Sequence, residues 1–166
     1  MTWLTPPLQV CSNVRRETKI LLLPGWSSSG SLKTDYLTFL GYDVMTPRLS
    51  DWWFTRAVAQ AQAACEMFNP DVIVGSSRGG AVAMNMESGT TPLVLLAPAW
   101  RRWGKARSTK KNSVVIHSPF DEYVPFSESV ELCKASGVSL IAAGVDHRLN
   151  CWEARMVLRE ALLGFI

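Results

Sequence analysis

Residues 71–80 of this 166-residue chain read DVIVGSSRGG. The β-branched, apolar residues of Asp71–Gly75 predict a buried strand, and the small residues after it predict a helix that begins near Arg78. Between the two lies the pattern G-x-S-x-G, with Ser77 at its centre. Between a strand and a helix, this pattern is typical of a sharp, strained turn that exposes the serine Oγ. Ser77 is therefore a candidate nucleophile.

A plain glycine-rich turn without catalysis is the alternative interpretation of this stretch. A phosphate-binding loop is less favoured, because neither G-x-x-x-x-G-K-[ST] nor G-x-G-x-x-G occurs there. Ser76 lies at the wrong offset between the two glycines to be the nucleophile. The N-terminal dipole of the following helix would favour negative charge beside Ser77.

On both sides of this stretch, short apolar runs alternate with amphipathic segments along the chain. The expected strands are Lys19–Leu23, Tyr42–Met45, Asp71–Gly75, Leu93–Leu96, Ser113–His117 and Val138–Ala142. The expected helices are Ser31–Leu40, a helix capped by Asp51 that runs through Cys65 and stops at Asn69-Pro70, Ala81–Met86, Ser127–Ala135 and Trp152–Leu163. This alternation predicts right-handed crossovers and a mainly parallel sheet covered by helices on both faces. We expect a three-layer α/β/α sandwich and one domain over residues 1–166.

Composition narrows the function classes. A net charge of +3 is modest, and we expect no nucleic-acid partner. No apolar run approaches the roughly 20 residues of a membrane-spanning helix, and the N-terminus lacks a secretory pattern, so we expect a cytoplasmic protein. The cysteines form no Cys-x-x-Cys pair, so we expect neither a metal site nor a cofactor and interpret them as reduced, structural thiols. They are Cys11, Cys65, Cys133 and Cys151.

A basic segment carries most of the charge asymmetry. Between Ser88 and Phe120 all six charged residues are basic: Arg101, Arg102, Lys105, Arg107, Lys110 and Lys111. Such a segment can attract anions, although a solvated loop is the simpler interpretation.

A serine hydroxyl needs a base to take its proton, and the chain has two histidines. His147 lies in a turn between the last expected strand and the last expected helix, and it comes late in the chain, as the order serine, acid, histidine requires. We favour His147 as the base. His117 ends an expected strand and is interpreted as a structural residue.

The acid that orients the base should lie between Ser77 and His147. Asp121 is favoured, because it lies in a loop at the carboxyl end of an expected strand. Its role would be to fix the histidine tautomer and to stabilise the imidazolium. Glu122 is the alternative. Asp146 adjoins His147 in sequence, where a steady hydrogen bond to the imidazole is awkward.

Acyl transfer also needs donors for the oxyanion of the tetrahedral intermediate. One is expected to be the backbone N–H of Arg78, directly after the nucleophile. The other is expected from the loop Pro24–Gly30, with the N–H of Trp26 first and that of Ser27 second. A flexible linker is the alternative interpretation of this loop.

Together these residues resemble small, capless α/β-hydrolases of the short bacterial serine esterase kind. The matching features span residues 20–150 and are the Pro24-Gly25 loop, the segment Gly75–Gly80, Ala97-Pro98-Ala99, the loop Asp121–Pro125 and Asp146-His147-Arg148. The resemblance implies a minimal α/β-hydrolase fold with nucleophile, acid and base at Ser77, Asp121 and His147. Many relatives have His-Gly where this chain has Pro24-Gly25, and that histidine is not part of the triad.

The resemblance also implies a carboxylic-ester hydrolase that forms an acyl-enzyme on a small-molecule ester or thioester, without a cofactor. Hydrolysis of thioesters or peptides by the same triad is the first alternative. A binding or regulatory module that retains the fold without turnover is the second. Specificity stays open, because the chain lacks the cap that often shapes substrate selection. Four tryptophans at loops or element ends either line the acyl pocket or serve packing: Trp52 and Trp100, the substrate-binding candidates, with Trp53 and Trp103.

Overall fold

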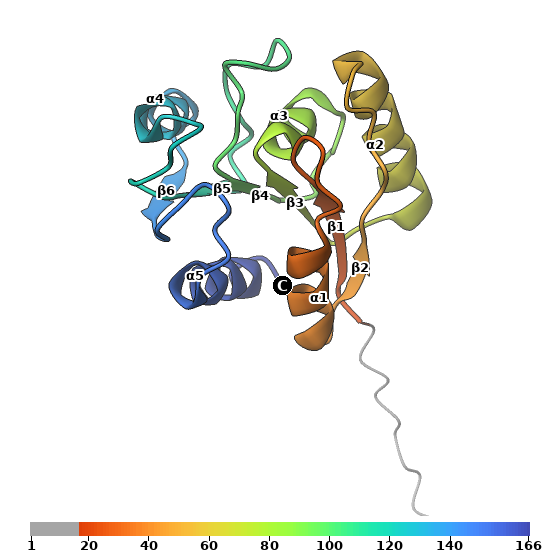
Figure 1. The fold of residues 1–166 in the computed structure, drawn as a ribbon. Helices are drawn as coiled ribbons and strands as arrows, with labels where there is room; N and C mark the ends of the chain where they lie inside the picture. The colour runs from red at the N-terminus through yellow and green to blue at the C-terminus, as the bar shows by residue number, and fades with distance from the viewer. Residues whose placement is uncertain (1–16) are drawn as a thin grey trace, which may run out of the picture.

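The computed structural model describes residues 17–166, in which six strands form one sheet (Figure 1). The strands are β1 (Lys19–Leu23), β2 (Asp43–Met45), β3 (Val72–Ser76), β4 (Leu93–Leu96), β5 (Ser113–His117) and β6 (Ser139–Ala142). Their order across the sheet is β2-β1-β3-β4-β5-β6, and every neighbouring pair in these residues is parallel. Parallel strands need crossover connections, which here contain the helices.

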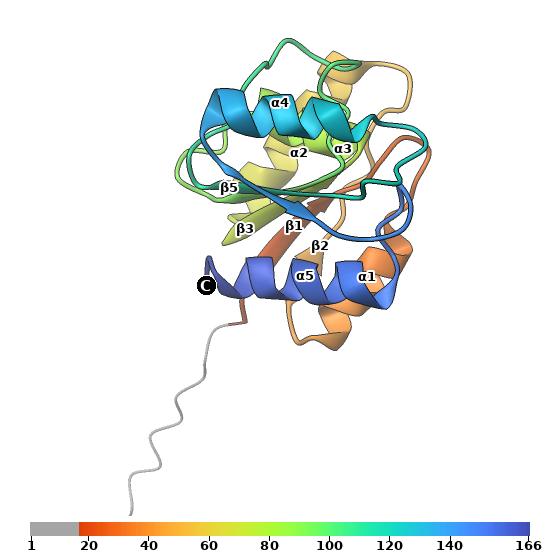
Figure 2. The ribbon, with the colours of Figure 1, turned by 90° about the vertical axis from the view of Figure 1, so that its left-hand side faces the viewer.

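The helices cover both faces of the sheet (Figures 1 and 2). On one face lie α1 (Ser31–Phe39) and α5 (Trp152–Leu163), and on the other lie α2 (Phe54–Phe68), α3 (Arg78–Asn85) and α4 (Phe126–Ser136). The three-layer α/β/α sandwich with a parallel sheet is therefore confirmed.

The central strands are apolar on both faces, because each face is covered. On β3, the side chains of Val72 and Val74 pack into the cluster that includes Leu158 of α5. Ile73 packs into the opposite cluster, which includes Leu132 of α4. Successive side chains of a strand point to opposite faces, so a continuous run of branched apolar residues fills both cores.

Most element boundaries match those expected, with one informative exception. The helix expected to begin at a cap on Asp51 begins at Phe54 instead, with Trp53 in the N-cap position. The Asp51 carboxylate accepts a hydrogen bond from the backbone N–H of Ser27. The capping prediction was wrong because a partner distant in sequence occupies the carboxylate. The end at Asn69 is confirmed, and Asn69 adopts the left-handed conformation there.

The strand order changes direction at β1. The chain passes from β1 to β2 on one side, and then crosses back to β3 on the other side of β1. Such switch points are where parallel α/β sheets bind ligands. Gly79 packs directly on the backbone of Leu23 and Pro24, leaving no room for a Cβ.

The structure also bears on membrane-spanning helices, metal-ligand clusters and cysteine pairing. No helix within residues 17–166 is long and apolar enough to cross a membrane. The same residues hold no cluster of three or more histidine, cysteine or acidic side chains that could bind a metal ion. Cys65, Cys133 and Cys151 are free thiols. Cys11 lies outside the described residues.

Candidate active site

Ser77 occupies a strained turn between β3 and α3. Its φ of 54° and ψ of −117° are rarely adopted by residues other than glycine. Its N–H donates to the carbonyl of Leu96 at 2.8 Å, and its carbonyl accepts from the N–H of Ala99 at 3.1 Å and of Gly80 at 3.0 Å. These bonds on both sides of the residue hold the unusual conformation.

A chain of short hydrogen bonds joins three loops. His147 Nε2 lies 2.9 Å from Ser77 Oγ, and His147 Nδ1 lies 2.6 Å from Asp121 Oδ2. The serine follows β3, the aspartate follows β5 and the histidine follows β6. The structure therefore brings together the three residues that the sequence singled out. With Nδ1–H directed to the carboxylate, Nε2 presents a lone pair to the serine hydroxyl.

The Asp121 carboxylate is fully buried and highly coordinated. Oδ1 accepts the backbone N–H groups of Tyr123 and Val124, each at 2.8 Å. Oδ2 accepts from His147 and from a second imidazole, that of His117, at 2.9 Å. Burial alone would raise the pKa of Asp121, but the bonds from Val124, His147 and Tyr123 outweigh it, and the pKa lies below its ordinary value. The surroundings of this carboxyl group therefore favour its ionised form.

Two other acidic side chains hold the backbone around His147. Glu122 Oε2 accepts the backbone N–H of His147 at 3.2 Å. Asp146 Oδ1 accepts the N–H of Leu149 at 3.1 Å. Neither bonds the imidazole, so the orienting position belongs to Asp121. The ring of Tyr123 packs edge-on against the imidazole, with centroids 5.4 Å apart.

Backbone donors flank the serine on its other side. Arg78 is the first residue of α3, and the first N–H groups of a helix have no partner within it. Gly25, in the loop after β1, lies against the Ser77 side chain. Within residues 17–166, the N–H groups of Trp26 and Arg78 have no hydrogen-bond partner, whereas that of Ser27 is committed to Asp51.

The side chain of Arg78 is a buried cation behind this turn, 2% exposed. Its Nη2 donates to the carbonyl of Ser50 at 2.7 Å, while its Nε has no partner among the described residues. The guanidinium lies 4.8 Å from the ring centroid of Trp103 and 5.6 Å from that of Phe54. Burial lowers the pKa of Arg78, and the charge of Asp51 opposes that effect. The cation thus braces the loops after β2 and β4.

His117 was interpreted as structural, but it touches the candidate triad through Asp121. A histidine at a strand end, four residues before an aspartate in the following loop, was the available signal. That signal is weak, because nothing in the sequence shows that the loop turns back over the strand.

The two tryptophans expected to bind substrate lie in different surroundings. Trp100 is 2% exposed and packs in the core, and its Nε1–H donates to the carbonyl of Glu128. Its expected role in substrate binding is therefore corrected to core packing. Trp52 is 82% exposed in the loop after β2. Of the other two, Trp53 is exposed, and Trp103 stacks on Phe54 and meets Trp26 edge-on.

A cleft of about 400 Å³ opens beside the turn that carries Ser77. It lies between the loops after β1 and β2, and Gly25 joins its lining to the Ser77 side chain. The rest of the lining is largely polar and includes Ser27, Ser28, Ser29, Thr46 and Arg48.

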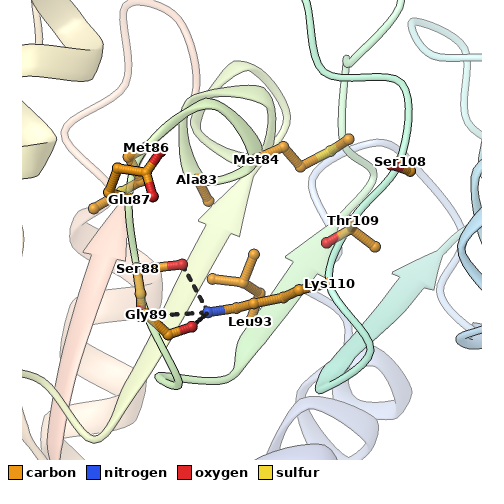
Figure 3. A pocket seen from close by; sticks show the side chains of 10 residues that line it. All are labelled: Ala83, Met84, Met86, Glu87, Ser88, Gly89, Leu93, Ser108, Thr109 and Lys110. Atoms are coloured by element: carbon orange, nitrogen blue, oxygen red, sulfur yellow. Dashed lines mark hydrogen bonds between the residues drawn. The ribbon is translucent and has the colours of Figure 1, made fainter.

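A second cavity, of about 220 Å³, lies under the turn between α3 and β4 (Figure 3). Lys110 lines it, with its ammonium directed at the hydroxyl of Ser88 and the carbonyls of Ser88 and Gly89 (Figure 3). Other cations of the basic segment are also engaged: Lys111 donates to the carbonyl of Ser136, and Arg101 pairs with Glu131. These contacts fasten the segment to its neighbours.

No family model matches the chain, and no curated protein matches its sequence. Solved structures do match it. A YdeN-like protein from Pectobacterium atrosepticum has a TM-score of 0.74 at 16% identity, over 90% of this chain and 90% of that chain. Est1E from Butyrivibrio proteoclasticus, with ferulic acid bound, has a TM-score of 0.71 at 13% identity, over 92% and 91%. An α/β serine hydrolase homologue from Coxiella burnetii has a TM-score of 0.63 at 14% identity, over 92% and 86%.

At these identities the likeness establishes the fold. The neighbours include esterases and serine hydrolases, and the match extends over most of each chain. This chain has the fold of the small α/β-hydrolases.

Proposed function

We propose that this protein is a serine hydrolase that cleaves small carboxylic esters. One observation carries the proposal: Ser77 Oγ, His147 and Asp121 form an unbroken hydrogen-bonded chain of 2.9 Å and 2.6 Å, with the serine on a strained turn. A serine next to a base, with the base held by a buried carboxylate, is the arrangement that activates a hydroxyl for acyl transfer.

In the proposed reaction Ser77 Oγ attacks the ester carbonyl while His147 Nε2 accepts the hydroxyl proton. Asp121 stabilises the resulting imidazolium and does not itself become protonated. The N–H groups of Trp26 and Arg78 bind the oxyanion. His147 then protonates the leaving alcohol, which leaves an acyl-enzyme on Ser77, and water activated by His147 releases the acid.

The cleft beside Gly25 is the proposed substrate site. It adjoins Ser77 on the side of the proposed oxyanion donors, and its polar lining suits esters that carry hydrogen-bonding groups. Trp52 lies exposed in one of the loops that border the cleft, where its ring could cover a bound acyl group. Because Est1E was solved with ferulic acid, methyl ferulate belongs in the first substrate panel beside simple p-nitrophenyl esters.

Covalent labelling with a fluorophosphonate probe tests the proposal. We expect labelling of the wild type and of Ser76→Ala, the matched control one residue away, and loss of labelling in Ser77→Ala. Absence of labelling in the wild type, or its persistence in Ser77→Ala, would falsify the nucleophile assignment. Turnover of matched ester, thioester and anilide substrates then separates esterase from thioesterase and peptidase activity. A labelled protein that turns over none of these substrates contradicts the ester-hydrolase proposal and favours a binding module.

A further inference from the structure

His117 shares the carboxylate of Asp121 with the proposed base. Its side chain ends β5 and is completely buried. Nε2 lies 2.9 Å from Asp121 Oδ2 and 3.1 Å from the carbonyl oxygen of Val124, and Nδ1 lies 2.7 Å from Ser129 Oγ on α4. Two imidazoles, those of His117 and His147, therefore converge on one carboxylate oxygen.

The surroundings of His117 determine which of its nitrogens carries the proton. A backbone carbonyl can only accept, so Nε2 must be the protonated nitrogen, shared between Val124 O and Asp121 Oδ2. Nδ1 then accepts the hydroxyl of Ser129. Burial lowers the pKa of His117 more than the charge of Asp121 raises it, so the neutral ring is favoured. The ring of Phe126 packs edge-on against the imidazole of His117, with ring centroids 5.5 Å apart.

We propose that His117 is a positioning residue for the reaction: its Nε2–H fixes Asp121 Oδ2 toward His147 and withdraws negative charge from that oxygen. The inference rests on the proposed roles of Asp121 and His147. The backbone donors bind Oδ1, so within residues 17–166 His117 is the second donor to Oδ2 besides His147.

A shared carboxylate stabilises an imidazolium less strongly than one that serves a single donor. His117 therefore withdraws part of the negative charge on Oδ2 that would otherwise stabilise the imidazolium of His147. The other titratable or charged groups around His147 and its loop are common to the wild type and to every His117 variant: Ser77, Glu122, Tyr123, Asp146, Arg148 and Lys33.

The pKa of His147 can be measured by NMR titration of its imidazole nitrogens in the full chain, without any substrate. His117→Met removes the donor at similar volume. His117→Gln keeps an amide N–H near the position of Nε2. Ser129→Ala removes the bond at the other nitrogen and leaves Nε2–H in place, so it controls for disturbance of the buried site.

We expect the imidazole of His147 to titrate at higher pH in His117→Met than in the wild type, because Asp121 Oδ2 then serves the imidazolium of His147 alone. The acid limb of the pH profile of kcat/KM should move to higher pH as well. His117→Gln should restore most of the wild-type value, and Ser129→Ala should leave the value unchanged. An unchanged pKa in His117→Met, or an equal shift in Ser129→Ala, overturns the proposal.

Two further readouts keep the test decisive. If His117→Met does not fold, the wild-type spectrum decides, because a His117 that titrates near neutral pH or carries its proton on Nδ1 contradicts the positioning role. The NMR readout is also independent of turnover. A protein with the expected titrations that no fluorophosphonate labels would refute the proposed hydrolase and leave the His117–Asp121 coupling standing.

Discussion

The carboxylate of Asp51 accepts the backbone N–H of Ser27 at 2.8 Å and so joins the loop after β2 to the loop after β1. Gly25 of the second loop lies against Ser77. This bond anchors Ser27, whose neighbour Trp26 carries the N–H that is a proposed oxyanion donor. Asp51 also favours the charge on Arg78, which braces the loops after β2 and β4.

We therefore predict that Asp51→Ala lowers kcat for ester hydrolysis on the order of tenfold, less than the loss of an entire oxyanion donor. Asp51→Asn keeps an acceptor oxygen and should retain most of the activity. Steady-state kinetics on one p-nitrophenyl ester compare the three proteins. Wild-type kcat in Asp51→Ala would show that this bond does not position the loop.

A second prediction concerns the close packing of the elbow. A Cβ on Gly79 would overlap the carbonyls of Leu23 and Pro24, which are backbone atoms of β1 and its loop and cannot rotate away. Gly79→Ala should lower the free energy of unfolding by about 3 kcal/mol or more, the upper range for overpacking. Gly164→Ala is the matched control, because its added Cβ would meet the Ala161 carbonyl at an ordinary 3.4 Å. Urea denaturation measures both, and equal stabilities would contradict the prediction.

The strand before Ser77 and the helix after it were predictable from the sequence, because apolar runs and glycines act within a few residues. The positions of Asp121 and His147 followed from the rule that loops at the carboxyl edge of a parallel sheet meet.

Other roles depend on contacts that no local pattern contains. Asp51 has the residue type and position of a helix cap, yet its carboxylate bonds Ser27, 24 residues away. His117 became part of the site only because the β5–α4 loop turns back over the strand end. Trp100 had the appearance of a loop aromatic, but the path of the chain after β4 returns it to the core.

A third prediction concerns the pH dependence of the free energy of unfolding. Lys33 of α1 donates to the carbonyl of Arg148 and to Asn150 Oδ1, and so ties the loop of His147 to α1. Burial lowers its pKa from 10.5 to about 8, with the charge of Asp146 opposing this. Between pH 8 and pH 10.5, Lys33 is largely protonated in the unfolded chain and largely deprotonated in the folded chain. The contribution of Lys33 to the free energy of unfolding therefore rises with pH across this range.

The matched comparison for Lys33 is Lys33→Met, which cannot titrate. The stability of the wild type relative to this variant should increase from pH 7.5 to pH 10, as measured by urea denaturation at each pH. All other ionisable groups are common to the two proteins and cancel. A constant or decreasing difference would contradict the lowered pKa.

The last prediction tests whether Ser77 and His147 act as one unit. Ser77→Ala should reduce turnover of a p-nitrophenyl ester to the residual rate that binding and oxyanion donors alone provide, while the thermal unfolding transition stays cooperative. His147→Ala should do nearly the same, since without the base the serine hydroxyl keeps its proton and is a poor nucleophile. The double variant should then be little slower than either single variant, because groups that act together are not additive. If the two losses multiplied instead, His147 would be acting on the substrate or on water independently of Ser77, and the covalent route through an acyl-enzyme would have to be abandoned.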